Sequence, residues 1–257
     1  MRVSSQDNVN FKAQLLSQWR CSSAKNKAKN VSIVAIEKKD LPFVKKFVDY
    51  IDAHKEENVV KKEIMKYSSR TILEVLEKNI GGSDKIKMFI ATHDRIPCGI
   101  FIANIPKVFA GDEAFVYSAR HNSGKNETEM DWLVTWNPKA NEKIKGIGKA
   151  LVGEYFRTVK KDKFRDVFVR SEVPEKSYAS YFYESLGFEQ TSTKRLKLFN
   201  KNSAQYVIND FSERDDDTIP MLITRSRLTK TAEELASKMF RQEFKKNSVE
   251  AEELIDI

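Results

Sequence analysis

The chain has 257 residues, of which 40% are hydrophobic, and it carries a formal net charge of +8. This size and apolar content can build one main domain with extensions, and the longest apolar runs, SIVAI and GIFIANI, are far shorter than the roughly 20 residues that a membrane helix needs. Because the basic residues are interleaved with 37 acids, the positive charge suits a phosphate-bearing cofactor or an acidic surface as well as nucleic acid.

The N-terminal part of the chain predicts a leader, then a strand and helices. Residues 1–29 are rich in Ser, Asn, Gln and Lys, so we expect a flexible leader outside the core, with one short helix at the apolar island Phe11–Trp19. The β-branched run VSIVAI at 31–36 predicts a strand. Apolar residues then recur at helical spacing after Asp40, a suitable N-cap, and residues 59–82 continue the helical pattern.

Strand patterns dominate the middle of the chain. Residues 87–105 alternate apolar and polar side chains around the turn His93-Asp94-Arg95, which predicts a β-hairpin. AFVYSAR at 114–120 and EMDWLVTW at 129–136 predict two further strands. The turn-rich sequence between Pro106 and Glu129 predicts a long, exposed loop over the sheet.

The last part of the chain predicts helices separated by strands. Helical spacing from Ile147 to Val159 predicts a helix, and DVFVRSEV at 166–173 predicts a strand. In EKSYASYFYESLGFEQ, at 175–190, we expect a helix that ends at Gly187 in the left-handed conformation and that shares one face among Tyr178, Phe182 and Leu186.

Beyond this helix, RLKLF at 195–199 and IPMLITRSRL at 219–228 predict a last antiparallel strand pair. Residues 229–257 predict a charged amphipathic helix with Leu235, Met239 and Phe240 on one side.

The segment KIKGIGKAL, residues 143–151, places two glycines one residue apart directly before a helical pattern. Without side chains at Gly146 and Gly148, a ligand can approach the backbone, and successive N–H groups at a helix N-terminus form a nest for an anion such as a pyrophosphate. Lys143, Lys145 and Lys149 add positive charge, or lie on a solvated surface. GxG alone favours a simple tight turn, and its spacing fits neither a dinucleotide-binding fingerprint nor a P-loop.

The context of this segment resembles the GNAT superfamily of acyl-CoA-dependent N-acetyltransferases. The strand DWLVTW, the loop NPKANEKIKGIG, a helix, the strand VFVRS and a helix with FYESLGF follow in the family's order. The family's cofactor signature matches both glycines and departs at its first position, where Lys143 replaces Gln or Arg. ANEKIKGIG is similar to the corresponding loop of the histone acetyltransferase branch. The second signature, a helix followed by a Gly-Phe pair, matches Ala179, Phe182, Tyr183, Leu186, Gly187 and Phe188.

The resemblance implies an α/β (α+β) fold: a GNAT-like, mixed, mostly antiparallel sheet of about seven strands flanked by helices. It assigns residues 30–228 to the acetyltransferase domain, between the leader 1–29 and a charged helical extension at 229–257. Two strands, 131–136 and 167–171, would splay apart and hold the pantetheine arm of acetyl-CoA, with no metal. The implied cofactor-binding residues are Val134, Thr135, Trp136, Lys143, Ile144, Lys145, Gly146, Ile147, Gly148, Lys149, Ala150 and Phe182.

Acyl transfer to an amine needs a neutral amine, yet an alkyl ammonium has a pKa of about 10.4, so a base is expected. Glu129 and Asp131 would point to one face of a regular strand, although a β-bulge would break that parity, and either residue could instead be a solvated residue at a strand edge. Tyr183 matches the family tyrosine that protonates the departing thiolate, with a packed aromatic as the alternative. A backbone N–H near Trp136 is the expected oxyanion donor.

The histidines and cysteines suggest no further site. His54, His93 and His121 are scattered among charged or turn-like residues, where surface histidines are expected. Cys21, in polar sequence, and Cys98, in an apolar strand pattern, have the spacing of neither a zinc site nor a disulfide framework.

The sequence therefore predicts an N-acetyltransferase that uses acetyl-CoA and a primary amine, with a protein lysine as one candidate acceptor, by direct attack in a ternary complex. The alternative is a catalytically inactive acyl-CoA-binding regulatory or interaction module. A nucleic-acid-binding protein is disfavoured because the chain lacks a concentrated basic stripe with stacking aromatics. We expect a cytoplasmic protein without a transmembrane segment, while the Ser/Asn-rich leader equally suits the export signal of a secreted bacterial effector.

Overall fold

The structure is a computed structural model that describes residues 12–23, 27–36, 40–54, 86–104, 127–139, 142–161, 166–169, 177–190, 221–244 and 248–256. Its longer strands are β1 Lys12–Ser23, β2 Ala28–Ile36, β3 Ile86–His93, β4 Ile96–Asn104, β5 Glu127–Thr135, β7 Asp166–Val169 and β9 Met221–Thr224. The short strands are β6 Ile144–Lys145, β8 Glu189–Gln190, β10 Gln242–Glu243 and β11 Ser248–Glu250. The helices are α1 Leu41–His54, α4 Ile147–Lys161, α5 Tyr178–Ser185, α8 Arg225–Lys238 and α9 Ala251–Leu254.

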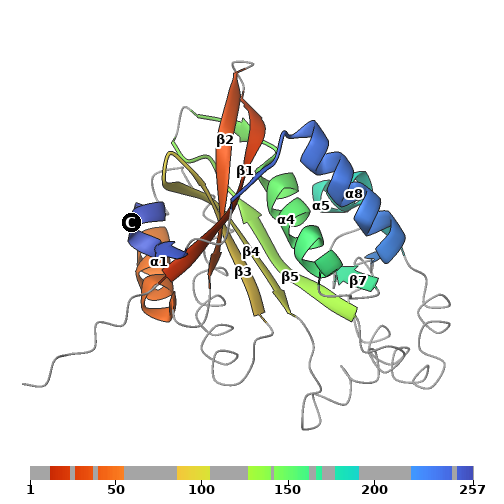
Figure 1. The fold of residues 1–257 in the computed structure, drawn as a ribbon, viewed down its shortest axis with the longest axis horizontal. Helices are drawn as coiled ribbons and strands as arrows, with labels where there is room; N and C mark the ends of the chain where they lie inside the picture. Colours follow the sequence, from red (N-terminus) through yellow and green to blue (C-terminus); the bar gives the residue numbers. More distant parts are fainter. Residues whose placement is uncertain are drawn as a thin grey trace, which may run out of the picture.

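All these strands join one open sheet in the order β10-β1-β2-β3-β4-β5-β7-β9-β8, with β6 and β11 also paired to β1. The neighbours along this order are antiparallel except β5 and β7, which are parallel. Helices lie on both faces of the sheet (Figure 1). The predicted fold class, a mixed and mostly antiparallel sheet flanked by helices, is confirmed.

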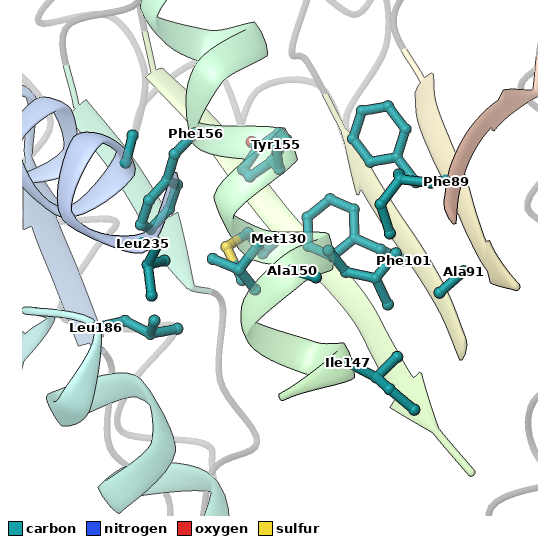
Figure 2. Close-up of a cluster of buried hydrophobic side chains, with 14 of the residues drawn as sticks. Phe89, Ala91, Phe101, Met130, Ile147, Ala150, Tyr155, Phe156, Leu186 and Leu235 are labelled. Atoms are coloured by element: carbon teal, nitrogen blue, oxygen red, sulfur yellow. The ribbon is translucent and has the colours of Figure 1, made fainter. Parts of the chain in front are cut away.

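Each face of the sheet has its own hydrophobic core. On one face, α4, α5 and α8 pack over a cluster that includes Phe101, Met130, Tyr155 and Leu186 (Figure 2). On the other face, α1 buries Phe43, Val44, Phe47 and Val48 beside Ile255, which follows α9. The strands between them are therefore buried on both sides, which explains the nearly continuous apolar runs of β2, β3 and β4.

The predicted hairpin and the central helices are confirmed. Strands β3 and β4 are joined at Asp94 and Arg95, whose φ angles of 50° and 66° are those of a tight turn that follows the sheet's twist. Helices α1 and α4 form where helical spacing predicted them, and α4 extends to Lys161. Helix α5 ends as predicted at Gly187, whose φ is +90°. None of the described helices has the length and apolar character needed to span a membrane.

The predicted flexible leader, residues 1–29, is wrong over residues 12–23, which form the longest described strand of the sheet, whereas residues 1–11 and 24–26 lie outside the described residues. Strand β1 pairs with β2 along most of its length, and Trp19 in it is completely buried. Its polar composition hid a period-2 pattern in which Ser17, Trp19 and Cys21 all point into the core. A β-bulge between Leu15 and Ser17 interrupts this alternation, so no simple strand pattern is visible in the sequence.

The predicted C-terminal extension is also wrong in part. A helix is present, but α8 begins at Arg225, within the segment that we predicted as a strand, and ends at Lys238. Strands β10 and β11 and helix α9 follow, so the end of the chain crosses the sheet edge to lie beside α1 (Figure 1). Leu235 is buried and Met239 is partly buried, as expected, whereas Phe240 is 68% exposed.

Of the remaining predictions, one differs from the structure and the others fall outside the described residues. On α5, Tyr178 is 97% exposed, and the buried side is formed by Ser180, Tyr183 and then Leu186. The helical pattern at 59–82, the strand patterns at 114–120 and 195–199, and most of the predicted loop at 106–129 lie outside the described residues.

Candidate functional site

The glycine segment forms the turn between β6 and α4. Gly146 has a φ of +99°, in the left-handed region where a Cβ would be strained. The first described hydrogen bond of α4 runs from the Ala150 amide to the Gly146 carbonyl, at 2.9 Å. The amides of residues 147–149 precede this bond and therefore have no carbonyl partner within the helix. The turn thus has the local geometry of an anion nest, with the helix dipole behind it.

Gly148 faces the space between β5 and α5. A Cβ built on it would lie 3.3 Å from Cζ of Phe182 and 3.8 Å from Cγ2 of Thr135. Thr135 is exposed and Phe182 is half-buried, so both reach solvent beside the turn. The structure therefore brings together three of the predicted cofactor residues, from β5, α4 and α5.

Strands β5 and β7 pair for only three residues. The parallel register joins Glu127 to Asp166, Thr128 to Val167 and Glu129 to Phe168. Strand β5 continues to Thr135, and none of its later residues pairs with a described residue of β7. Among the described residues, this part of the β5 edge, next to the glycine turn, has backbone N–H and C=O groups that a ligand can bind.

A β-bulge lies at the point where this pairing ends. Opposite β5, Ala103 is in register with Met130, whereas the preceding Ile102 is in register with Trp132, which leaves Asp131 as the extra residue. The strand is therefore irregular here, as in the bulged alternative, and the condition for Glu129 and Asp131 to share a face by simple alternation is not met. Their side chains lie outside the described part of the structure.

The register after the bulge shows which backbone groups are available. The Trp136 amide donates to the Cys98 carbonyl at 2.9 Å, so a donor near Trp136, as predicted for the oxyanion, would have to be another amide. Hydrogen-bonded and non-hydrogen-bonded pairs alternate in an antiparallel ladder. Val134, opposite Ile100, then also bonds to β4, whereas Leu133 and Thr135 direct their N–H and C=O groups away from β4. The sequence did not indicate that the backbone groups of Leu133 are available to a ligand, because the register of β5 against β4 depends on the bulge.

Tyr183 lies on the buried side of α5 and is only 9% exposed. Its ring makes edge contacts with Phe182 and Phe188, at centroid distances of 5.3 and 5.5 Å. Burial raises the pKa of the phenol to about 12, so the hydroxyl keeps its proton at neutral pH and can donate it in a hydrogen bond.

The other predicted cofactor residues fall into two groups. The side chains of Ile144, Ile147 and Ala150 are buried in the core under α4, and Trp136 is buried on the opposite face of the sheet, where Val134 also packs. Figure 2 shows Ile147 and Ala150 pointing from α4 toward the sheet. Lys143 and Lys145 are exposed and Lys149 is half-buried. The buried residues can therefore contribute backbone groups, and the lysines can contribute charge.

The loop that leads to the glycine turn is held by Glu142. Its carboxylate is paired with Lys29, and it lies 3.3 Å from Nε2 of His93. The hydrogen bond from Lys29 lowers the pKa of Glu142, and His93 adds to the effect. His93 is buried and donates from Nδ1 to the Asn30 carbonyl at 2.8 Å, which corrects the expectation of a surface histidine. Sequence alone did not indicate this cluster because its members lie on three separate segments.

Two residues that are far from Gly146 in the sequence pack against the glycine turn. A Cβ built on Gly146 would lie 3.3 Å from Cε of Met239 and 3.8 Å from Sγ of Cys21. Burial raises the pKa of the Cys21 thiol to about 12 and raises that of Cys98 well above its usual range. Both cysteines of the chain are therefore neutral thiols, and neither is a ready nucleophile.

No protein-family model and no curated protein matches the chain. Among solved structures, a putative GNAT-family acetyltransferase from Desulfovibrio desulfuricans is 14% identical, with a TM-score of 0.45 over 76% of this chain and 99% of its own. The PaiA N-acetyltransferase from Thermoplasma acidophilum, in complex with coenzyme A, is 15% identical, with a TM-score of 0.42 over 76% of this chain and 98% of its own. The ribosomal-protein-S18-alanine N-acetyltransferase from Escherichia coli is 15% identical, with a TM-score of 0.42 over 76% and 93%. These similarities concern the fold.

Proposed function

We propose that the protein is an acetyl-CoA-dependent N-acetyltransferase that acts on a primary amine by direct attack. The observation that carries this proposal is the left-handed turn at Gly146, which opens α4 beside the part of β5 that no described residue of β7 pairs with. A diphosphate fits the amides of residues 147–149, and an extended amide-containing chain fits the outward N–H and C=O groups of Leu133 and Thr135. Coenzyme A contains both groups, joined end to end.

Bound acetyl-CoA would supply an activated acetyl thioester. Direct attack by the amine is favoured over an acetyl-cysteine route, because both cysteines of the chain are buried with raised thiol pKa values. The outward N–H groups of Leu133 and Thr135, which lie near Trp136 in the chain, are the candidate donors to the developing oxyanion.

Tyr183 would act on the departing sulfur as a hydrogen-bond donor. With a pKa of about 12 against about 8.5 for a free thiol, complete proton transfer from the phenol is unfavourable by roughly 3 to 4 pKa units. A hydrogen bond to the developing thiolate requires no such transfer and strengthens as the negative charge grows.

The amine must lose a proton, and Glu129 and Asp131 are the candidate bases on β5. Glu129 lies at the last β5–β7 pair, and Asp131 is the bulged residue just beyond it. Separate Glu129→Gln and Asp131→Asn variants assign the role. Loss of the base should remove the acidic limb of the pH profile of kcat/KM, and the other variant should keep it.

The test of the proposed function measures coenzyme binding and acetyl transfer on the same samples. CoA should raise the melting temperature by mass action, and acetyl-CoA should acetylate at least one member of a panel of peptides, polyamines and aminoglycosides, detected by mass. A protein-lysine acceptor predicts that lysine peptides are the preferred members. Failure of millimolar CoA to stabilise the protein would overturn the cofactor assignment, and binding without transfer would favour the acyl-CoA-binding module.

Two glycine variants provide a matched pair. Gly146 and Gly187 both have left-handed φ angles, of +99° and +90°, but only Gly146 lies at the proposed diphosphate site. An alanine in this region costs about 1 to 2 kcal/mol. Gly146→Ala should therefore weaken CoA binding by about tenfold, whereas Gly187→Ala should lower stability and leave CoA affinity close to that of the unmodified protein.

A further inference from the structure

The C-terminal strap, defined as residues 239–244, runs along the outer edge of β1. The Arg20 amide donates to the Met239 carbonyl at 2.7 Å, and the Phe244 amide donates to the Leu16 carbonyl at 3.1 Å. Further along β1, Ser22 and Ser23 pair with Lys145 and Ile144 of β6, immediately before the glycine turn. One strand thus carries both the strap and the segment that enters the turn.

The strap also contacts the turn itself. The methyl group of Met239 would lie 3.3 Å from a Cβ on Gly146, so it fills the space directly beneath the left-handed glycine. Met239 is the C-cap of α8, and its amide donates to the Leu235 carbonyl at 2.9 Å. Its position is therefore set by α8 on one side and by β1 on the other.

A buried ion pair ties the strap to α4. Arg241 donates from Nε and from Nη2 to the two carboxylate oxygens of Glu154, each at 2.9 Å, and the two side chains are 5% and 6% exposed. The Ser17 hydroxyl also donates to Glu154 at 2.6 Å, and Trp19 donates to Ser17 at 2.8 Å. A buried bidentate pair of this kind has little geometric freedom, so it fixes the position of α4 against the strap. The hydrogen bond from Ser17 links the same carboxylate to β1.

We propose that Met239 and Arg241 are positioning residues for the coenzyme-binding turn, so that the C-terminal strap supports the acetyl-CoA site from outside it. This inference rests on the proposed function. Met239 holds Gly146 in its left-handed conformation, and Arg241 holds the axis of α4 through Glu154. Both keep the amides of residues 147–149 in place for a diphosphate, and neither touches the coenzyme. The C-terminal strap therefore contributes to the affinity for CoA.

The first test compares Met239→Ala with Met239→Leu and with Leu235→Ala, in the full-length protein. Met239→Ala should weaken CoA binding by about tenfold, measured by calorimetry, and should raise the KM for acetyl-CoA with little change in kcat. Met239→Leu should restore most of the affinity. Leu235 is more deeply buried on the same helix but is not the residue beneath Gly146, so Leu235→Ala should lower the melting temperature at least as much and leave CoA affinity within about twofold.

The second test measures amide hydrogen exchange of α4 in Met239→Ala and in Arg241→Met. Exchange should accelerate first at the start of α4, where the Ala150 amide donates to the Gly146 carbonyl, under conditions where the rest of α4 stays protected. This measurement remains informative when Arg241→Met folds poorly, because Met239→Ala leaves the ion pair intact. Uniform acceleration along α4, or equal CoA affinity in Met239→Ala and Leu235→Ala, would overturn the positioning role.

The unmodified protein separates this inference from the proposed function. If it does not bind CoA, the proposed function fails and the strap has no coenzyme site to position. If it binds CoA and Met239→Ala binds equally well, the proposed function stands and the positioning role is wrong.

Discussion

Helices α5 and α8 end in the same motif with different residues. In α5, the Phe188 amide donates to the Tyr183 carbonyl and the Gly187 amide donates to that of Glu184. In α8, the Arg241 amide donates to the Ala236 carbonyl and the Phe240 amide donates to that of Ser237. Both are Schellman motifs, which need a left-handed residue after the C-cap. Gly187 meets this need at φ +90°, whereas Phe240 adopts φ 45° in spite of its Cβ.

The difference shows why one side of the molecule could be predicted and the other could not. Around α4 and α5, local signals agree with the fold: glycines stand where φ is positive, and Ser177 caps α5 by accepting from the Ser180 amide. Around β1 and the strap, local signals disagree with the fold. Phe240 takes the left-handed position at the end of α8, and β1 contains many polar residues although it lies in the core. There, non-local pairing decides the structure.

The largest expected effect is on stability, from Trp19→Ala in β1. Trp19 is completely buried and packs so closely on Gly153 that a Cβ there would lie 2.7 Å from its ring. We expect a loss of about 3 to 5 kcal/mol in the free energy of unfolding, measured by urea denaturation. Ser22→Ala, at an exposed position of the same strand, should change it by less than about 0.5 kcal/mol. A loss for Trp19→Ala as small as that would contradict the place of β1 in the core.

The next largest effect is on turnover, from Tyr183→Phe on the well-predicted side. Loss of the phenol hydroxyl should lower kcat by about 100-fold with little change in CoA affinity, because the hydroxyl meets a charge that exists only as the carbon–sulfur bond breaks. Tyr181→Phe, on the exposed side of the same helix, is the control and should keep normal turnover. Unchanged turnover in Tyr183→Phe would make this residue a packing aromatic.

The hairpin, helix α4, the end of α5 and the glycine turn could be predicted because each depends on residues close together in the sequence, whereas the fold class was predicted from the resemblance to a family. The bulge at Asp131 could not, since a register shift is set by the partner strand β4. The hydrogen bond from the Trp136 amide to the Cys98 carbonyl depends on the same register and could not be predicted either. Likewise, the contact between Met239 and Gly146 joins segments almost a hundred positions apart, and nothing in either segment indicates the other.

A smaller effect should appear in the pH dependence of stability. Burial raises the pKa of Cys21 from 9.0 to about 12, so the folded protein binds this proton more tightly than the unfolded chain. Its contribution is complete below pH 9 and is lost as the pH rises toward 12, at up to about 1.4 kcal/mol per pH unit. Cys21→Ala should therefore lose stability less steeply than the unmodified protein between pH 9 and 11. Parallel curves for the two proteins would show that Cys21 ionises as easily in the folded state as in the unfolded state.

The smallest expected effect concerns the end of α8. Glycine at position 240 would adopt the left-handed conformation without a Cβ penalty of about 1 to 2 kcal/mol, but it would lose the contact of the Phe240 ring with Arg20, 5.4 Å away, worth about 0.5 to 1 kcal/mol at an exposed site. Phe240→Gly should therefore raise the free energy of unfolding by at most about 1.5 kcal/mol. Phe240→Ala loses the ring and keeps the Cβ, so the difference between the two variants isolates the backbone term. If the alanine variant is as stable as the glycine variant, the left-handed conformation carries no penalty at this position, and the absence of glycine does not explain why the end of α8 was missed.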